Sequence, residues 1–425
     1  MTPSGLLASA VLIGAFAAAG GLVRRAVARR RLGLAHPAAV WLLLTGLFFG
    51  VGSVVLAVGG ETAGPALSVG GAVLAFAVGV WASDRLAIER GDAEPVDPQD
   101  PELAVPAGTR PGAALVLAGI ALAAIAPTLI GHGIPFLTTD ITGARAELTG
   151  IPIQLVRVAL PGLAAILMFQ LARTDDRRRR WLAGLGIVAI GAFTVLLASR
   201  YLVAELGAVL ALAWLLAGRR VPARLALAVA GVAVIGFAGI QVLRAYDQAA
   251  GNELGFAVGR TVNRIVLVQP RTLAALERVI PAEEPYFLGL TWLRRLGPIV
   301  GREDIPNLGY WIYPEVVEGA QDTAGYAAPG LIGEAWANFG PPGLLVFVLL
   351  GVIAERLGAL VAVRRSSAVD LAAGAMAILF LARTHALGLG GLAILIGLVI
   401  AWRLVAGHDD GLVRTVARIV TWRCG

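Results

Sequence analysis

The residues best suited to chemistry lie in a stretch rich in glycine and aromatic residues, 325–343. Glu334 and Asn338 are four positions apart in it, so a helix would place both on one face. Pro329 suits the first turn of such a helix, and the Gly-Pro-Pro run at 340–342 would end it. A buried carboxyl can act as a general base, because burial raises its pKa towards neutrality. The alternative is a packing element in which Glu334 caps a helix or pairs with an arginine.

Two further residues could accept a proton, His385 first and Asp140 second. All 35 basic residues are arginines, which excludes lysine Schiff bases and Walker-type phosphate lysines. A guanidinium binds phosphate oxygens through two parallel hydrogen bonds, so arginines are the only cations here that could hold a phosphate. No His, Asp and Glu cluster has metal-ligand spacing, and the single cysteine, Cys424, excludes a cysteine-built metal site. We therefore expect no metal and no cofactor.

The elements that must position these residues are membrane-spanning helices. The chain of 425 residues is 58% hydrophobic and 15% charged, whereas soluble domains carry about 25% charged residues. A helix needs about 20 apolar residues to cross a bilayer. The sequence predicts an all-α polytopic membrane protein with about eleven spans, at 4–23, 37–58, 66–83, 112–130, 151–171, 181–198, 203–218, 225–243, 342–361, 369–383 and 387–405.

Arginines in the short connecting segments predict the orientation, because cytoplasmic loops carry an excess of positive charge. Arginine runs follow the first, fifth, seventh and ninth spans, all on one side if the spans alternate. We therefore expect a bacterial cytoplasmic (inner) membrane protein with its N-terminus outside and its C-terminus in the cytoplasm. Four regions result: spans 1–8 in 1–243, a long extracytoplasmic loop with short helices in 244–328, a broken helix and spans 9–11 in 329–405, and a basic amphipathic tail in 406–425.

A second set of arginines does not follow the positive-inside pattern. An arginine inside a span is costly and usually faces a bundle interior or a wet cavity. Arg157 lies inside the fifth span, and nothing comparable occupies the inner half of the bilayer apart from Arg403. The arginines that we expect on the outer side are Arg145, Arg200, Arg244, Arg260, Arg264, Arg271, Arg278, Arg294, Arg295, Arg302 and Arg383. Pairing with acids of the long loop is the alternative for Arg271, Arg278, Arg294, Arg295 and Arg302.

All six tyrosines, Tyr201 and Tyr326 among them, fall on this same predicted side. An interfacial aromatic belt would populate both faces, so we interpret some of these rings as contacts for carbohydrate or lipid headgroups; belt packing is the alternative. In the long loop, 256–280 has helical apolar spacing, which we expect Pro270 to interrupt. His36 is expected to be incidental on the cytoplasmic side.

Three short stretches within residues 115–360 carry a family resemblance. They are Gly133 to Phe136 continuing through Asp140, Arg145 and Gly150; Ser199-Arg200-Tyr201-Leu202; and Gly333-Glu334 followed by Asn338-Phe339-Gly340 and Gly343. They resemble the Wzy-type oligosaccharide repeat-unit polymerases, which assemble O-antigen and related surface polysaccharides. The resemblance implies a glycosyltransferase C-like membrane fold and substrates that are oligosaccharides linked to polyprenyl pyrophosphate.

The resemblance also implies a reaction and its participants. An acceptor hydroxyl would attack the first sugar of the growing chain and displace polyprenyl pyrophosphate, with Glu334, His385 or Asp140 as the base. Arginines would stabilise the charge on the leaving group. The lipid bilayer, a flippase and a chain-length regulator are the implied partners, and nucleic acid is not one. The candidate substrate- and pyrophosphate-binding residues are Arg145, Arg157, Arg200, Arg244, Arg260, Arg264, Arg383, Tyr201, Tyr326 and Asn338.

Other functions fit the same distribution of residues. An O-antigen-type ligase would use a similar donor and move the glycan to another acceptor. A flippase or transporter would move the lipid-linked glycan without forming a bond, and it should show polar residues at the midplane and related halves, which the sequence lacks. A purely structural membrane scaffold would leave the outer arginines without a role.

Overall fold

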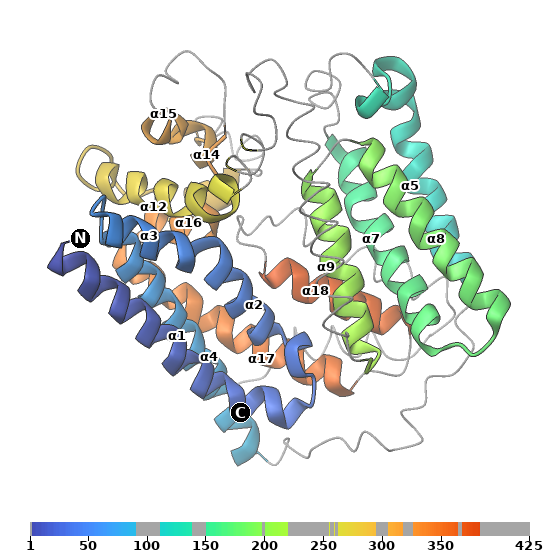
Figure 1. Ribbon diagram of the computed structural model, residues 1–425, viewed down its shortest axis with the longest axis horizontal. Coiled ribbons are helices and arrows are strands. Elements are labelled where there is room, and N and C mark those ends of the chain that lie inside the picture. Colours follow the sequence, from blue (N-terminus) through green and yellow to red (C-terminus); the bar gives the residue numbers. More distant parts are fainter. Residues whose placement is uncertain are drawn as a thin grey trace. The chain divides into compact units, whose positions relative to one another are not determined.

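The computed structural model describes the chain in ten segments, 2–90, 111–137, 150–197, 200–219, 255, 259, 262–294, 305–317, 326–363 and 368–382. The regular elements in these segments are all helical. The chain divides into two compact units, each made of segments distant in the sequence (Figure 1). The first comprises residues 1–96, 241–362 and 380–389, and the second 97–240, 363–379 and 390–425.

The first unit contains a bundle of long apolar helices. Its members are α1 (Pro3–Arg30), α2 (Pro37–Thr45), α3 (Val51–Gly59), α4 (Gly64–Glu89) and α17 (Leu344–Val363), with a short 3-10 turn η1 (Gly33–Ala35) before α2. A π-helical turn, η2 (Gly46–Gly50), joins α2 to α3, so the two form one continuous helical stretch. Trp41 of α2 stacks on Phe76 of α4 with ring centroids 4.0 Å apart, which anchors this stretch to the bundle.

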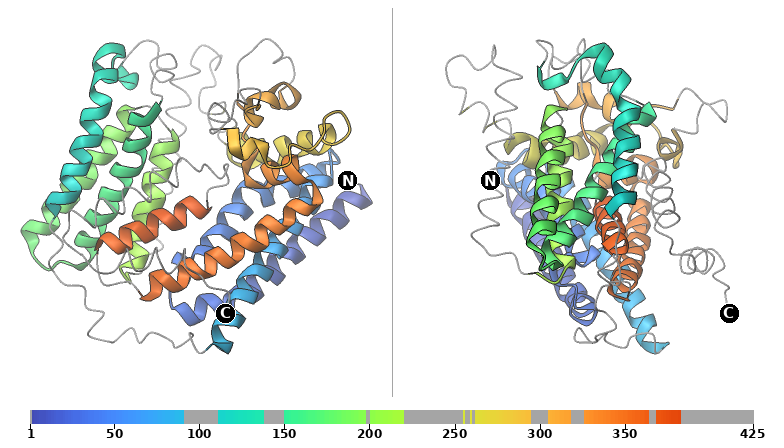
Figure 2. Two further views of the ribbon diagram at one scale, coloured as in Figure 1. Left: turned by 180° about the vertical axis from the view of Figure 1, so that it is seen from behind. Right: turned by 90° about the vertical axis from the view of Figure 1, so that its right-hand side faces the viewer.

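Short helices gather at the end of this bundle that carries the N-terminus (Figures 1 and 2). They are η6 (Asn263–Leu267), α12 (Val268–Val279), α13 (Leu290–Leu293), α14 (Leu308–Trp311), α15 (Tyr313–Val316), α16 (Gly330–Phe339) and η9 (Pro341–Gly343). The sequence suggested that Pro270 would interrupt the helix of the loop, but the helix continues through Pro270, because η6 leads directly into α12. The irregular part is the π-helical turn η6 directly before it.

The second unit is also helical. It contains α5 (Pro111–His132), η4 (Pro135–Leu137), α7 (Gly150–Arg173), α8 (Arg177–Leu196), α9 (Arg200–Leu216) and most of α18 (Ala368–Ala382). Helix α7 packs against α5, α8 and α9. The side chain of Asp176 caps α8 by accepting hydrogen bonds from the backbone N–H groups of Arg178 and Arg179.

Six helical segments of the described residues are long and apolar enough to cross a membrane: Pro3–Arg30, Pro37–Gly59, Gly64–Glu89, Ala118–Leu137, Arg177–Leu196 and Pro341–Ala362. Two shorter apolar helices are Ala159–Arg173 and Leu202–Leu216. The predicted spans at 225–243 and 387–405 lie outside the described residues, and each of the other predicted spans coincides with a helix. An α-helical membrane protein is therefore supported, with six candidate spans described rather than eleven.

The helices α1, α4 and α17 run in the same direction. Close contacts place Gly70 beside Leu12 and Gly71 beside Leu344 near one end. Near the other end Arg29 pairs with Asp84, and Arg30 pairs with Glu355. An alternating topology requires this common direction for the first, third and ninth predicted spans. Which end faces the cytoplasm stays a prediction.

A buried ionic cluster joins these three helices at their arginine-rich ends. Arg30 Nε lies 2.9 Å from Glu355 Oε1, and His36 Nε2 lies 3.1 Å from Glu355 Oε2. Arg29 Nη1 lies 2.7 Å from Asp84 Oδ1 nearby. His36 is wholly buried, and its Nδ1 accepts the backbone N–H of Ala38 at the start of α2. The proton therefore sits on Nε2, which donates to Glu355.

This ionic cluster corrects two predictions. His36 is not incidental, because it caps α2 and hydrogen-bonds to a buried carboxylate. The arginine-rich halves of the candidate spans are also not free of polar groups, because Asp84 and Glu355 are buried there. These acids pair with arginines that follow the positive-inside pattern, so neither partner stands out in the sequence.

We expect Gly351→Ala to lower the thermal unfolding temperature of the protein. A Cβ at Gly351 would overlap the backbone carbonyl oxygen of Phe76, so α4 and α17 would have to separate. Overpacking of this kind costs about 1–3 kcal/mol. Gly14→Ala in α1 is the matched control, because a Cβ there meets nothing within 4 Å and alanine favours a helix by about 0.5–1 kcal/mol. A Gly351→Ala protein as stable as the Gly14→Ala protein would contradict the close packing.

Candidate functional site

The predicted broken helix is present and organises the candidate site. Pro329 stands directly before α16, and the helix ends at Gly340, whose φ of +62° is costly for any residue with a side chain. The 3-10 turn η9 follows, and α17 begins at Leu344. Helix α16 is therefore a separate ten-residue element that precedes a candidate span.

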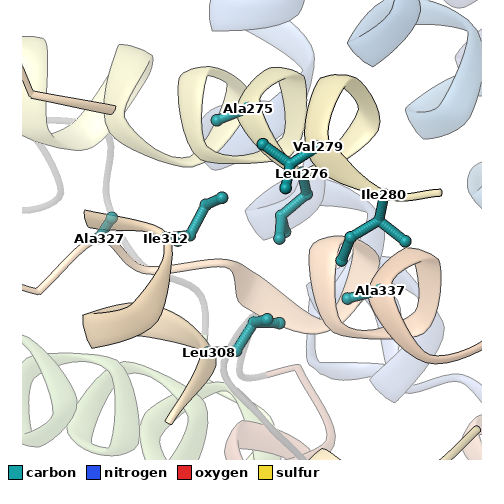
Figure 3. Close-up of a cluster of buried hydrophobic side chains, with 8 residues drawn as sticks. All are labelled: Ala275, Leu276, Val279, Ile280, Leu308, Ile312, Ala327 and Ala337. Carbon is teal, nitrogen blue, oxygen red and sulfur yellow. The ribbon is translucent and has the colours of Figure 1, made fainter. Parts of the chain in front are cut away.

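A small hydrophobic core attaches α16 to α12 and the nearby turns (Figure 3). Its buried members are Ala275, Leu276, Val279, Ile280, Leu308, Ile312, Ala327 and Ala337. Apolar residues recur at helical spacing along α12, which gives that helix one apolar face for this contact. Gly333 of α16 faces the side chain of Leu276, where a Cβ would come within 3.0 Å. The short helices thus form a packed layer with its own core.

Asn338 fixes the segment 287–291 against the end of α16. Its Oδ1 accepts the backbone N–H of Gly289 at 2.8 Å, and its Nδ2 donates to Thr291 Oγ1 at 2.6 Å and to the carbonyl of Glu334 at 2.8 Å. Two backbone bonds, from Phe287 N–H to the carbonyl of Ala337 and from Leu288 N–H to that of Asn338, complete the junction. Asn338 is therefore a positioning residue of the candidate site.

Glu334 lies on the same face of α16 as Asn338 and is only 7% exposed. Its Oε2 is buried without a hydrogen bond among the described residues, and so is the indole Nε1 of Trp292. Burial raises the pKa of Glu334 to about 7, and interaction with the Trp292 N–H opposes part of that rise. Buried polar atoms without partners are rare, and a catalytic role is one explanation for them. None of the ion pairs found in the described residues involves Glu334, so it is not explained as a partner of an arginine there.

Tyr326 lies near Glu334, and Tyr310 and Arg294 lie near Tyr326. The rings of Tyr310 and Tyr326 meet edge to face with centroids 5.2 Å apart, and the residues are 57% and 42% exposed. Desolvation at its hydroxyl and then the charge of Glu334 raise the pKa of Tyr326, while Arg294 opposes this rise. The Tyr326 hydroxyl therefore stays protonated and can donate a hydrogen bond at neutral pH.

A second carboxyl near α16 was missed by the sequence reading. Glu277 of α12 accepts a hydrogen bond from the hydroxyl of Ser68 in α4 and lines a pocket of about 390 Å³. Burial raises the pKa of Glu277 to about 7, and the Ser68 hydrogen bond opposes that rise. The sequence contains a signal for Glu277, because this acid lies beside Leu276 on the apolar face of α12. However, the acids of the loop were interpreted only as partners for arginines.

The structure brings together only some of the predicted site residues. Glu334, Tyr326 and Asn338 belong to the layer of short helices, and Arg264 is exposed on η6. Arg157 lies on α7, with Arg200 and Tyr201 on α9, but their side chains are outside the described part. The candidates wholly outside the described residues are Asp140, Arg145, Arg244, Arg260, Arg383 and His385.

Arg278 pairs with an acid of the long loop, as the alternative interpretation proposed, and Arg271 pairs with an acid outside that loop. Arg278 Nη2 lies 2.7 Å from Glu315 Oε2, a loop acid, and Arg271 Nη2 lies 3.5 Å from Glu61 Oε1, which follows α3. All four side chains are at least 41% exposed, so each pair stabilises the fold by no more than about 1 kcal/mol. Ion pairing thus explains Arg271 and Arg278, whereas no ion pair of Arg294 is found in the described residues.

Comparison with known proteins identifies no relative. No family model, curated protein or solved structure matches the chain. Function must therefore be argued from the site.

We expect Asn338→Ala to loosen the segment 287–291 without unfolding the protein. The substitution removes three hydrogen bonds and leaves buried polar groups unpaired, at a cost of about 1–3 kcal/mol for each such group. Hydrogen exchange measured by mass spectrometry should show faster exchange of the Phe287, Leu288 and Gly289 amides. Asn307→Ala is the control, because the Asn307 side chain makes no cap hydrogen bond at the start of α14. Unchanged exchange in Asn338→Ala would refute the positioning role.

Proposed function

We propose that the protein is a membrane glycosyltransferase that polymerises oligosaccharide repeat units carried on polyprenyl pyrophosphate, at the outer face of the bacterial cytoplasmic membrane. The buried carboxyl of Glu334 carries the proposal, because its unpartnered Oε2 and a pKa of about 7 suit a general base. The exposed rings of Tyr326, near Glu334, and of Tyr310, which contacts Tyr326, suit sugars, whose apolar faces pack on aromatic rings. The resemblance to Wzy-type polymerases supports the same assignment.

The reaction is a displacement at the first sugar of the growing chain. The acceptor hydroxyl gives its proton to the Glu334 carboxylate, and its oxygen forms the new glycosidic bond. The bond from that sugar to pyrophosphate breaks, and polyprenyl pyrophosphate leaves with the electron pair. Arginines stabilise the charge that develops on the leaving group, and Arg294, near Tyr326, is the described arginine closest to this role. In this scheme a carboxylate takes the proton, and arginines bind the leaving group.

Purified protein in nanodiscs, given lipid-linked repeat units from the host, should form a ladder of lengthening glycans. Arg200→Lys is expected to weaken ladder formation at least about tenfold, because an ammonium cannot reproduce a bidentate guanidinium contact with phosphate. Arg178→Lys, in the exposed run that begins α8, is the control. Equal ladders from both variants would remove Arg200 from the pyrophosphate site.

Two alternatives give different products in the same assay. A ligase would attach one glycan to a different acceptor, lipid A core or protein, without chain growth. A flippase would carry the lipid-linked glycan across a liposome bilayer and form no glycosidic bond. Either result, in place of a ladder, would replace the proposed polymerase.

A further inference from the structure

A pocket of about 390 Å³ lies between α4, α12, α16 and the start of α17, all within the first unit. Its volume falls in the range of about 300–1,000 Å³ that is typical of small-molecule sites. The pocket adjoins Gly64 and Pro341, the first residues of two candidate spans, so it sits where a span begins. A ligand carried by a membrane lipid could reach this position.

The walls of the pocket are mainly apolar, with one carboxyl. Leu344, Phe347 and Trp336 contribute apolar surface. The indole N–H of Trp336 donates to the carbonyl of Ile280 at 3.4 Å, which holds the ring in place. Glu277 and Ser68 supply the acidic and hydroxyl groups of the wall.

The carboxyl of Glu277 keeps one oxygen available. Its Oε1 accepts from Ser68, but no donor in the described part of the chain hydrogen-bonds to Oε2. Oε2 lies beside Gly64, where a Cβ would collide with it. Oε2 thus packs against the backbone of Gly64, and a side chain at position 64 would displace the carboxyl that lines the pocket.

The charge of the pocket selects its ligand. Glu277 is the sole charged residue among those lining it, and no arginine is present. A carboxylate repels phosphate, so the pocket does not suit a pyrophosphate. A hydroxyl group suits it, because a carboxyl in either protonation state can form a hydrogen bond with a hydroxyl.

We propose that this pocket binds one sugar residue of the lipid-linked glycan, with the apolar face of the sugar against Trp336 and one hydroxyl donating to Glu277 Oε2. The inference rests on the proposed function, and it adds a sugar subsite distinct from Glu334. Helix α16 separates the two carboxyls, because Ile332, Ala335 and Trp336 line the pocket, whereas Glu334 faces Trp292. Glu334 would accept the proton, and Glu277 would hold a sugar in register.

The test measures binding without requiring turnover. The full chain in nanodiscs is titrated with octyl glycosides of glucose, galactose, N-acetylglucosamine and rhamnose, and with 1-octanol, while saturation-transfer NMR reports the bound ligand. At least one glycoside should bind saturably and more tightly than octanol. Glu277→Leu should weaken glycoside binding about tenfold, the loss expected for a hydrogen bond to a charged group, and should leave octanol binding unchanged.

Two matched variants keep the test decisive. Gly64→Ala should weaken glycoside binding as Glu277→Leu does, because its methyl group would collide with Oε2 and displace the carboxyl, whereas Gly59→Ala meets open space and should have no effect. Glu283→Leu, an exposed acid beyond α12, controls for loss of charge. Glycosides that bind no better than octanol, or that bind equally well to Glu277→Leu, would overturn the sugar subsite. Failure of the ladder assay with glycoside binding intact would instead overturn the proposed polymerase.

Discussion

Glu334→Gln is expected to stop chain growth, with a fall in the rate of ladder formation of at least about 100-fold. General-base catalysis typically contributes 10²–10⁴-fold, and an amide of nearly the same shape cannot accept the proton. Glutamine keeps one side-chain oxygen, so the interaction with the Trp292 N–H can persist in the variant. The rate of ladder formation by the purified protein measures the effect, and thermal unfolding verifies that the variant is folded.

The pH dependence of the wild-type rate provides an independent readout. The pKa of Glu334 is about 7, so its carboxylate form, and with it the rate, should rise as the pH increases through about 7. The stability effect has the opposite sign. A folded-state pKa above the unfolded value of about 4.3 stabilises the fold below that value, and this contribution is lost as the pH rises through about 7. The protein should therefore gain activity in the same pH range in which it loses this stabilisation.

Glu284→Gln is the matched control for Glu334→Gln, because Glu284 is an exposed acid in the turn after α12. It should keep the wild-type ladder and the wild-type pH profile. A full ladder from Glu334→Gln would exclude Glu334 as the base and return attention to His385 and Asp140. Normal activity with a lost pH dependence would show that Glu334 tunes the reaction and does not carry the proton.

The sequence predicted the local architecture of the site well, because strong local signals determine it. Pro329 and the Gly-Pro-Pro run at 340–342 bound a helix by backbone constraints alone. The i,i+4 relation of Glu334 and Asn338 then follows from helix geometry. The long apolar segments were equally visible, because a span needs a run of apolar residues that few other elements have.

Contacts between distant segments could not be predicted from the sequence. Glu277 meets Ser68 across 209 positions, and His36 meets Glu355 across 319. No local pattern specifies such pairs, and a charge inside an apolar helix reveals a partner only after the helices are placed side by side. The carboxyls of Glu334 and Glu277 also lie on opposite sides of helix α16, and the sequence indicated only Glu334 as a candidate.

Glu355→Ala is expected to cause the largest loss of stability, a fall of about 3–5 kcal/mol in the free energy of unfolding. The substitution leaves Arg30, which is 8% exposed, and the wholly buried Nε2–H of His36 without their acceptor. Removal of one partner from a buried pair costs this much because the remaining charge stays desolvated. Unfolding by SDS in mixed micelles, followed by circular dichroism, measures the change. Glu89→Ala breaks an exposed pair with Arg85 and should cost less than about 0.5 kcal/mol.

A triple variant distinguishes two possible roles of the buried charges. They can stabilise the fold as a paired group, or the reaction itself can require them. Arg30→Met with Glu355→Met removes both charges, and His36→Asn keeps an N-cap acceptor for α2 while it removes the Nε2–H donor. Apolar replacement of a complete buried network is often neutral or stabilising, so the triple variant should regain most of the stability lost in Glu355→Ala. If it also forms ladders at the wild-type rate, Arg30, His36 and Glu355 hold α1, α2 and α17 together and do no chemistry. A stable triple variant that forms no ladder would show instead that the reaction needs the buried charges, which a purely structural role does not allow.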